Sequence, residues 1–404
     1  MVSVQYINFF KRLDSGEKYI VSGIILSFIF GGFGDLPPLF GLIIMTIGFI
    51  KIVRKKGCQE VFNTPLTRPL LLLFVVAILS LVKVFSYISV FNMLGTMLEI
   101  VAGFFIVFYF LKNRKEQFHK KMVSILLIGG LITGLYGLYE GFFIVPRRLE
   151  SIIGNANLLG VYMMFMLFLG LSLFYKKDYK NWAAGCVLFL IFGYNLMFSL
   201  SFSALVGTVA AFMLFFTLLN KKLLIVFFII LALSPQLIPG ELTQRIESTY
   251  TAIQEGDYQR PFIYKSAYEM FTDNPVLGVG IGHFREHFFD YNDPEAPRQD
   301  RQYNHAHNII LQVLSELGLM GLLAFLYLLA MIVKTTYRAL PFTHDFKGYL
   351  CLLFTSAFFG FFFQEQTEFS LISSAIAVLV GILLGWWMAL LAEQKKGKET
   401  KTAN

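Results

Sequence analysis

The chain has 404 residues, of which 56% are hydrophobic and 15% charged, and its formal net charge is +8. A helix crosses the bilayer core with about 20 largely apolar residues, and stretches of this kind recur along the whole chain. The composition excludes a soluble protein and predicts an all-α polytopic membrane protein.

Twelve apolar segments are candidate membrane spans. They are residues 19–34, 37–53, 69–86, 89–111, 122–145, 157–175, 182–199, 202–219, 223–239, 305–333, 347–364 and 371–391. The first two are short and contain Gly31-Gly32 and Pro37-Pro38, so a re-entrant pair is an alternative for them. We expect residues 1–404 to form a single integral-membrane domain.

Two local patterns refine this organisation. Met1–Lys18 is polar and amphipathic and has no small-residue cleavage site, so we expect no cleavable signal peptide. The fifth segment contains Gly129, Gly130, Gly134, Gly137 and Gly141. Lipid provides no hydrophobic drive for helix association, so small residues of this kind predict close helix packing.

Basic residues gather on one side when the chain is threaded through twelve spans. The lysine-rich loops at 51–56, 112–121 and 176–180 and the tail at 393–404 all fall there. The positive-inside rule predicts that this side is cytoplasmic, together with both termini. The positive charge is therefore a topology signal, and we expect no nucleic-acid partner.

The segment 240–304 has the opposite balance, with six basic and eleven acidic residues, a net charge of −5. We predict that it is a large extracytoplasmic loop between the ninth and tenth segments. Tyr258–Thr272 reads as an amphipathic helix with a proline in its first turn, and a short helix is expected around His283–Phe289. Asn292–Arg301 is polar and contains prolines, which is typical of a mobile lid.

The sequence His305-Ala306-His307-Asn308 marks the point where this loop re-enters an apolar segment. One interpretation is helix capping, because Asn308 can accept hydrogen bonds from the free N–H groups of the first turn. Capping does not account for His305, Gln312 and Glu316, which share a stripe within about 40° on a helix. Polar residues inside a span usually face a cavity or the bundle interior.

Arginines on the extracytoplasmic side form a second group. Arg148 precedes the sixth segment, and Arg245 and Arg260 lie in the large loop. The guanidinium group is a rigid fork of donors that suits phosphate oxygens. Convergence of these three side chains would create a site for a diphosphate.

Three further polar residues could line a substrate cavity. Asn155 and Asn157 lie at the mouth of the sixth segment, and Ser201 lies in the short turn between the seventh and eighth. The serine hydroxyl could instead bond to its own helix.

Four histidines raise the question of a metal. His283 and His287 are four residues apart and share a helix face, and with His305 and His307 they could bind zinc. No acidic residue stands at a recognised ligand spacing from them. We expect no metal, and we expect His283 and His287 to lie on an ordinary interfacial surface.

Together these features resemble the O-antigen ligase and polymerase superfamily of bacterial membrane glycosyltransferases. The family pattern H-[NSQ]-x9-G-x-x-[GTY] is matched by His307-Asn308, nine residues, Gly318 and Gly321. Arg260, followed by Pro275-Val276-Leu277-Gly278-Val279-Gly280, is similar to the family's arginine and P-x-x-G-x-G loop.

Two segments match the family less closely. Arg148 followed by Gly154-Asn155-Ala156-Asn157 is similar to an arginine and N-P-N segment, with Ala156 in place of the proline. Ser201-Phe202-Ser203 stands where the family often has an S-R-G-like turn, so one arginine is missing.

The resemblance implies about twelve spans in the bacterial cytoplasmic (inner) membrane, with an active site on the extracytoplasmic face. It implies inverting transfer of a glycan from undecaprenyl diphosphate to a hydroxyl of a lipid-, glycan- or protein-linked acceptor, without metal, nucleotide or other cofactor. His307 is our candidate for the general base, with His305 second and Glu316 as an orienting group. Arg148, Arg245 and Arg260 would hold the diphosphate; Asn155, Asn157, Asn308, Gln312 and Ser201 would line the cavity.

Alternative functions remain at this point. A polymerase would use the same donor and extend another lipid-linked repeat unit. A transporter or flippase for lipid-linked glycans could use Glu99, Glu140, Glu316 and Glu365 in a coupled pathway, but we find no matching halves of the kind that transporters contain. A purely structural scaffold has no need of interfacial histidines and arginines.

Overall fold

The computed structural model describes residues 9–29, 36–57, 61–82, 87–144, 148–176, 178–233, 240–255, 258–298 and 300–402. All regular secondary structure within these stretches is helical, as predicted for the all-α class. Nine of the described helices are long and apolar enough to cross a membrane. They are α3 (Leu36–Lys56), α5 (Tyr87–Leu111), α6 (Glu116–Tyr139), α7 (Ala156–Gly170), α8 (Tyr179–Phe198), α9 (Phe202–Leu219), α14 (Ile309–Ala339), α15 (Phe346–Gln364) and α16 (Ser374–Thr402).

Three apolar helices are shorter than a span. They are α2 (Ser15–Ile29), α4 (Thr67–Ser80) and α10 (Lys221–Leu233). The predicted segments 19–34, 69–86 and 223–239 each run on into residues outside the described ones. The total of twelve membrane spans therefore stays a prediction. The residues from 393 to 402, expected to form a tail, continue the helix α16.

Small residues bring several helices into close contact. A Cβ added to Gly207 of α9 would lie 2.6 Å from the carbonyl oxygen of Gly360 in α15, so the two backbones touch there. This contact positions α15, and the loop that follows α15 contributes to the site described below. In α6, Gly130 faces Met166 of α7 and Gly137 faces Asn195 of α8. The close packing predicted from the glycines of the fifth segment is confirmed.

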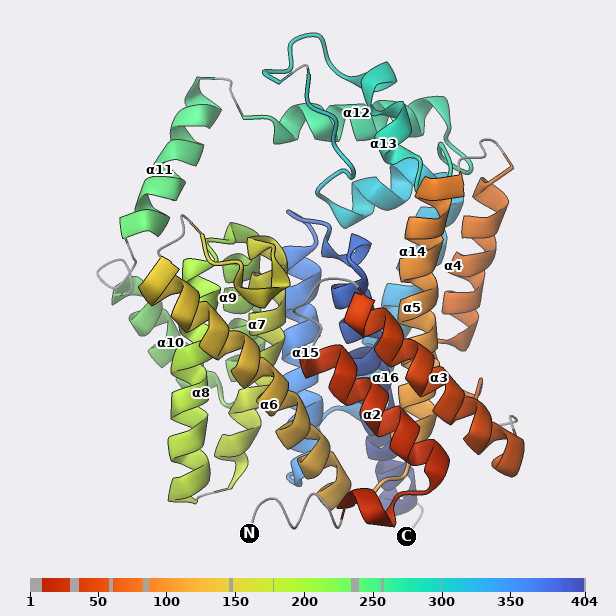
Figure 1. Ribbon diagram of the computed structural model, residues 1–404, viewed down its shortest axis with the longest axis vertical. Helices are drawn as coiled ribbons and strands as arrows, with labels where there is room; N and C mark the ends of the chain where they lie inside the picture. The colour runs from red at the N-terminus through yellow and green to blue at the C-terminus, as the bar shows by residue number, and fades with distance from the viewer. Residues whose placement is uncertain are drawn as a thin grey trace.

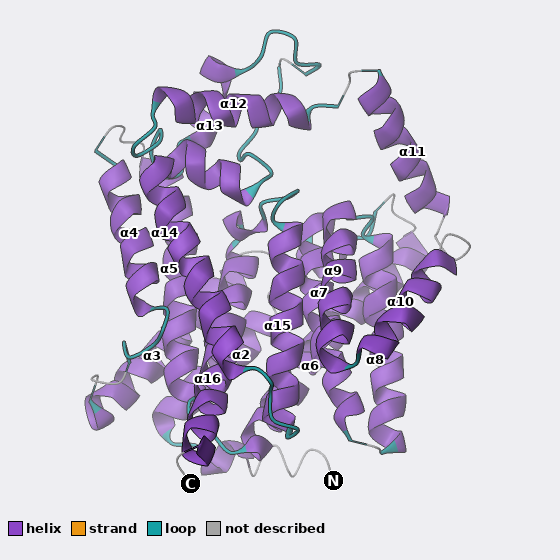
Figure 2. Cartoon of the chain, turned by 180° about the vertical axis from the view of Figure 1, so that it is seen from behind, coloured by secondary structure: helices purple, strands orange, loops and turns teal. Residues whose placement is uncertain are grey.

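The segment after α10 forms a separate layer at one end of the bundle (Figure 1). It contains α11 (Gly240–Gln254), α12 (Arg260–Asp273) and α13 (Phe284–His287), followed by the turn η5 (Phe288–Tyr291). The helices predicted around Tyr258–Thr272 and His283–Phe289 are both present. The view from behind shows α12 lying across the first part of α14 (Figure 2). The start of α2 and the end of α16 lie at the opposite end of the bundle (Figure 1).

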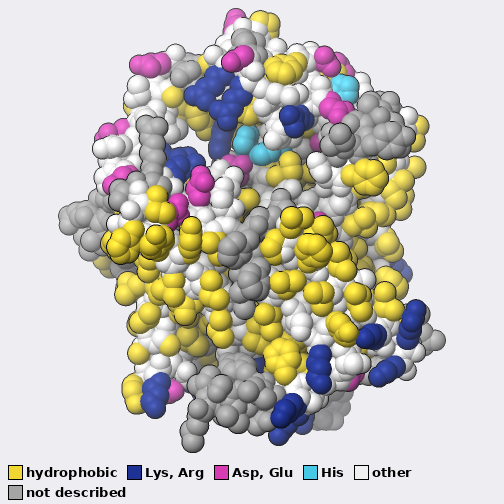
Figure 3. Space-filling model, viewed as in Figure 1, with side chains coloured by type: hydrophobic (Ala, Val, Ile, Leu, Met, Phe, Trp, Pro, Cys, Tyr) yellow, Lys and Arg dark blue, Asp and Glu magenta, His cyan; other side chains and the backbone are white. Residues whose placement is uncertain are grey.

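The surface shows the asymmetry that a membrane protein requires. Hydrophobic side chains form a broad band around the helices on the visible face (Figure 3). Lysine and arginine side chains gather below this band, at the end where α16 finishes, and most of the acidic side chains lie above it. The protein is a multi-pass membrane protein.

The polar segment that the sequence suggested as a lid is anchored on α12. The Asp293 carboxylate pairs with the Lys265 ammonium, and the backbone N–H of Arg298 donates to Oε1 of Gln259 at 3.2 Å. These contacts hold residues 293–298 against the start and middle of α12.

Candidate functional site

The first helical turn of α14 positions the two candidate histidines. Asn308 is the N-cap, and its side-chain oxygen accepts hydrogen bonds from the N–H groups of Ile310 and Leu311 at 2.9 and 3.0 Å. Its amide donates to the carbonyl of Gln366 at 2.9 Å, which ties this turn to the loop after α15. Capping thus explains Asn308. His307 has a φ of +52°, a left-handed conformation that costs a non-glycine residue free energy and is concentrated at functional sites.

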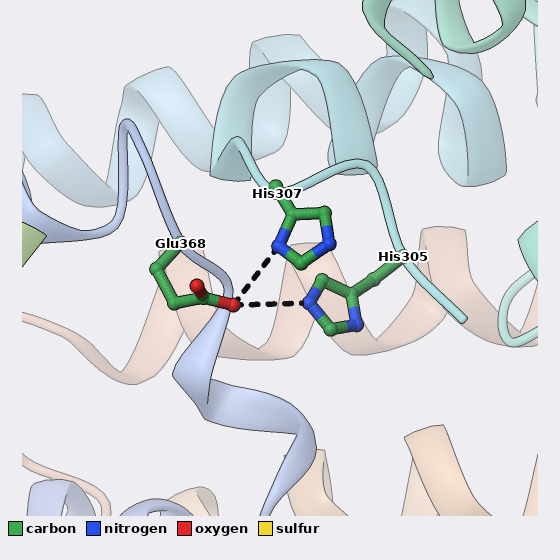
Figure 4. A group of neighbouring side chains, drawn as sticks. All are labelled: His305, His307 and Glu368. Atoms are coloured by element: carbon green, nitrogen blue, oxygen red, sulfur yellow. Dashed lines mark hydrogen bonds and ion pairs between the residues drawn. The ribbon is translucent and has the colours of Figure 1, made fainter. Parts of the chain in front are cut away.

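That loop supplies Glu368, which the sequence reasoning missed. Its Oε1 lies 3.0 Å from Nδ1 of His307 and 3.3 Å from Nε2 of His305 (Figure 4). Its Oε2 accepts a hydrogen bond from the Asn157 amide at 2.8 Å and lies 3.7 Å from Nη2 of Arg260. One carboxylate therefore joins both imidazoles to groups from α7 and α12.

The charge of Glu368 determines which ring nitrogens carry hydrogen. Burial raises the pKa of Glu368, but the hydrogen bonds from His305 and His307 outweigh this and hold the pKa well below its usual range. An ionised carboxylate only accepts hydrogen bonds. Nδ1 of His307 and Nε2 of His305 must therefore both carry hydrogen in the neutral rings. Nε2 of His307 then keeps its lone pair, as a general base requires.

His305 is the more enclosed imidazole. Burial lowers its pKa, the hydrogen bond to Glu368 acts in the opposite direction, and the neighbouring His307 lowers it further. Its Nδ1 is buried and finds no hydrogen-bond partner among the residues that the structure describes. The His305 ring is thus held neutral. Its side chain is 15% exposed and that of His307 is 21% exposed, so His307 is the more accessible of the two imidazoles.

Arg148 reaches the cluster through Asn157. Its Nε donates to the carbonyl of Ser199 at 3.0 Å, and its Nη2 donates to Oδ1 of Asn157 at 2.7 Å. The same Asn157 donates to Glu368. A hydrogen-bonded chain therefore runs from Arg148 to the carboxylate that holds the imidazoles.

Arg245 on α11 and Arg260 at the start of α12 complete a cationic group. Burial lowers the pKa of Arg148 to about 10, and the charge of Arg245 adds to this shift. Burial also lowers the pKa of Arg245, with the charge of Arg260 as the second cause. The positive charge of Arg245 thus acts on Arg148, and that of Arg260 acts on Arg245, although the three residues come from distant parts of the sequence. Figure 3 shows basic and histidine side chains together in a hollow below α12.

The remaining predicted cavity residues support the backbone. Asn155 caps α7 by accepting from the N–H groups of Asn157 and Leu158 at 2.9 and 3.2 Å. Oε1 of Gln312 accepts from the N–H of Ala306 at 2.7 Å, between the two histidines. Ser201 is fully buried, with its hydroxyl 3.1 Å from that of Ser203. Of this group, Asn157 alone contacts the Glu368 carboxylate in the described structure.

Glu316 lies in a different environment from the histidines. It is buried inside α14, and its Oε1 accepts a hydrogen bond from the backbone N–H of Phe284 at 3.1 Å. This carboxylate holds the start of α13 and is also hydrogen-bonded to the side chain of Gln312. No direct contact with either imidazole is seen among the described residues, so its orienting role stays a prediction.

A break in α14 explains the glycines of the histidine motif. Gly318 has φ of 61° and ψ of −159°, which interrupts the helix. The N–H groups of Val279 and Gly280 donate to the backbone carbonyls of Ser315 and Glu316 at 2.8 and 3.0 Å. The N–H of Leu319 donates to the backbone carbonyl of Pro275 at 2.8 Å. The segment 275–280 is thereby docked in the break.

The docking leaves no space for a side chain at the crossing. A Cβ on Gly278 would lie 2.3 Å from the carbonyl carbon of Glu316, and one on Gly318 would lie 2.5 Å from Val276. The glycine pattern thus serves backbone packing.

His283 and His287, the other two histidines of the loop, are not part of the cluster. His283 is fully buried, with Nδ1 3.0 Å from the carbonyl of Ile281, so the surface position expected for it is wrong. The ring fits there because it packs beneath the glycine turn. His287 is partly exposed and lies 3.3 Å from Asp290.

His305, His307 and Glu368 also have the geometry of a metal site, with three potential ligand atoms within 4.8 Å of one another. Their surroundings oppose a divalent cation. The carboxylate already faces Arg260, and Arg148 and Arg245 add further positive charge. The residues present fit an anion better than a metal ion.

Part of the chain is similar to a known protein family. A family model described as O-Antigen ligase matches residues 187–326 of the chain. The matched segment contains Arg245, Arg260, His305 and His307 and ends before Glu368. None of the curated proteins that were compared matches the chain.

Proposed function

Given that the match over residues 187–326 supports the O-antigen ligase and polymerase superfamily, we propose that this protein transfers a glycan from undecaprenyl diphosphate to an acceptor hydroxyl. The observation that carries the proposal is the convergence of Arg148, Arg245 and Arg260 on the cluster of two histidines. These side chains come from the loop before α7, from α11 and from α12.

The charge of the site suits the leaving group. Three guanidinium groups stand against two carboxylates, Glu368 at the cluster and Glu150 beside Arg148, so the described site carries an excess of positive charge. A diphosphate diester carries a negative charge on each phosphate and gains more negative charge as the glycosidic C–O bond breaks. Fixed donors aimed at developing charge are usually the largest single contribution to catalysis.

The location of the site suits a lipid-linked donor. His307 lies just before Asn308, the N-cap of α14, and Asn157 lies in the first turn of α7. Both therefore stand at the ends of helices long and apolar enough to span a membrane. A polyprenyl chain can remain in the bilayer while its diphosphate reaches the arginines. By the positive-inside rule, this end is extracytoplasmic, in the cytoplasmic membrane of a bacterium.

His307 serves as the general base. Its Nε2 removes the proton of the acceptor hydroxyl as the acceptor oxygen attacks the anomeric carbon. The electron pair of the breaking C–O bond leaves with the diphosphate, which the arginines hold. Attack opposite the leaving group inverts the anomeric centre, and no metal takes part. General-base catalysis of this kind contributes about 10²–10⁴-fold in rate.

Reconstituted transfer tests the proposal. Purified protein in liposomes is given an undecaprenyl-diphosphate-linked glycan and candidate acceptors, and products are separated by size. Wild-type protein should form transferred glycan, and His307→Ala should lower the rate by about 10²–10⁴-fold without changing the melting temperature by more than a few degrees. Transfer to a lipid core or protein acceptor identifies a ligase, and lengthening of the lipid-linked glycan a polymerase.

Near wild-type transfer by His307→Ala would contradict the base assignment. Uptake of the lipid-linked glycan across the membrane without any transferred product would instead indicate a transporter.

A further inference from the structure

We propose that Glu368 is a positioning residue that couples donor binding to the general base. When the donor binds, Arg260 turns from Glu368 to the diphosphate, and the carboxylate then stabilises the positive charge that forms on His307. The inference rests on the proposed glycan transfer and adds to it a role for a residue outside the family match. Glu368 touches neither substrate in this scheme. It acts through the imidazoles on one side and the arginines on the other.

The two carboxylate oxygens have separate partners. Oε1 accepts hydrogen bonds from His307 and His305, at 3.0 and 3.3 Å. Oε2 faces the Asn157 amide at 2.8 Å and Arg260 at 3.7 Å. The carboxylate is only 8% exposed, so solvent screens these interactions weakly. A change on one side of Glu368 is therefore felt on the other.

The contact with Arg260 is the one that a donor can replace. At 3.7 Å it is longer than a good charge-assisted hydrogen bond of about 2.7–2.9 Å. A diphosphate offers Arg260 several oxygens and more negative charge than the carboxylate does. When Arg260 turns to the donor, the negative charge of Glu368 is left facing the imidazoles and stabilises a positive charge on them.

The proton balance is complete within these groups. The acceptor proton moves to Nε2 of His307, while Nδ1–H stays hydrogen-bonded to Oε1 of Glu368. The resulting imidazolium is neutralised by Glu368, and the departing diphosphate is neutralised by the arginines. The imidazolium returns its proton to water or to the released diphosphate before the next turnover.

The variant Glu368→Gln separates this role from a merely structural one. It removes the negative charge that competes with the donor for Arg260, so undecaprenyl diphosphate should bind several-fold more tightly. It also removes the counter-charge of the imidazolium, so kcat should fall by about 100-fold or more. The acidic limb of the pH–rate profile should move to lower pH, because the imidazole loses a partner that favours protonation. Glu368→Asp should recover part of kcat.

Glu365→Gln is the matched control, three residues earlier in the same loop. Glu365 is fully enclosed and bonds to Ser370 and not to an imidazole. Near neutral pH the Glu365→Gln variant should have the same kcat, donor affinity and pH profile as wild type.

Two results would overturn the inference. Weaker donor binding together with lower kcat in Glu368→Gln would indicate a structural role alone, and an unmoved acidic limb would show that the carboxylate does not act through the base. Failure of the proposed function is distinguishable, because wild-type protein would then form no transferred product. The binding of undecaprenyl diphosphate to both forms would still show whether Glu368 competes for Arg260.

Discussion

The cluster of His305, His307 and Glu368 and the docked segment 275–280 both adjoin the first half of α14. A buried carboxylate lies at each, Glu368 in the cluster and Glu316 of α14 beside the docked segment. Glu368 is surrounded by side chains, two imidazoles, an amide and a guanidinium, which can exchange partners when a ligand arrives. The Glu316 carboxylate accepts hydrogen bonds from the backbone N–H of Phe284 and from the side chain of Gln312 in its own helix. Its backbone carbonyl accepts one from the N–H of Gly280, and these contacts belong to the fold.

The difference divides the family pattern into two parts. His307 forms the proposed chemical part, and Asn308, Gly318 and Gly321 form the architectural part. A Cβ on Gly321 would lie 2.1 Å from Cβ of Leu317, on the far side of the break. A short sequence motif can thus combine residues that act on a substrate with residues that only hold the first group in place. The following variants test this division, beginning with the largest expected effect.

Arg260→Ala should damage function and spare the fold. Arg260 contributes charge-assisted hydrogen bonds to the proposed diphosphate, worth about 1.5–3 kcal/mol each, so kcat/KM should fall by roughly 10–100-fold. Its removal also relieves repulsion with Arg245, so the melting temperature should stay within a few degrees of wild type. The measurements are transfer kinetics and thermal denaturation in detergent. Arg298→Ala, an exposed arginine of the same loop, is the control and should retain wild-type kinetics.

A large loss of melting temperature in Arg260→Ala would place this residue in the architectural part and weaken the donor site.

Gly318→Ala should show the opposite pattern. The φ of 61° and ψ of −159° suit glycine almost exclusively, which costs another residue about 1–3 kcal/mol. The added Cβ would also lie 2.5 Å from the backbone of Val276, which cannot move without undocking the turn. We expect the melting temperature to fall by several degrees, with transfer lost in proportion to the folded protein that remains.

Gly193→Ala provides the comparison for that change. Gly193 lies inside α8, and beyond its own stretch of that helix no atom of the described residues lies within 4 Å of an added Cβ. Alanine is the better helix former by about 1 kcal/mol, so this variant should be at least as stable as wild type. Equal stability of Gly318→Ala and wild type would show that the break in α14 is not required.

The sequence was sufficient for much of this picture, for identifiable reasons. Apolar length predicts spans, glycines predict helix contacts, and the positions of Arg148, Arg245 and Arg260 on one side follow from counting passes. The same count would have placed Glu368 on that side, because the eleventh segment ends just before it. Its partnership with His307 could not be predicted, since it depends on how α15 packs against α14 and α7. The burial of His283 likewise depends on the docked turn.

Glu365 provides the smallest test, because it belongs to neither part. Burial raises its pKa to about 8 from an ordinary value of 4.5, while hydrogen bonds from Ser370 oppose the shift. An acid whose pKa is raised by folding contributes stability that is present below its unfolded pKa and is lost as pH rises through the folded value. Wild type should therefore lose stability relative to Glu365→Gln between pH 4.5 and about 8 and no further above it. Thermal denaturation at pH 5, 7 and 9 would show the glutamine variant gaining a few degrees over wild type, most of it by about pH 8. A constant difference across this range would mean that Glu365 titrates normally, in which case its charge would add to that of Glu368 at neutral pH and Glu365→Gln could no longer serve as its neutral control.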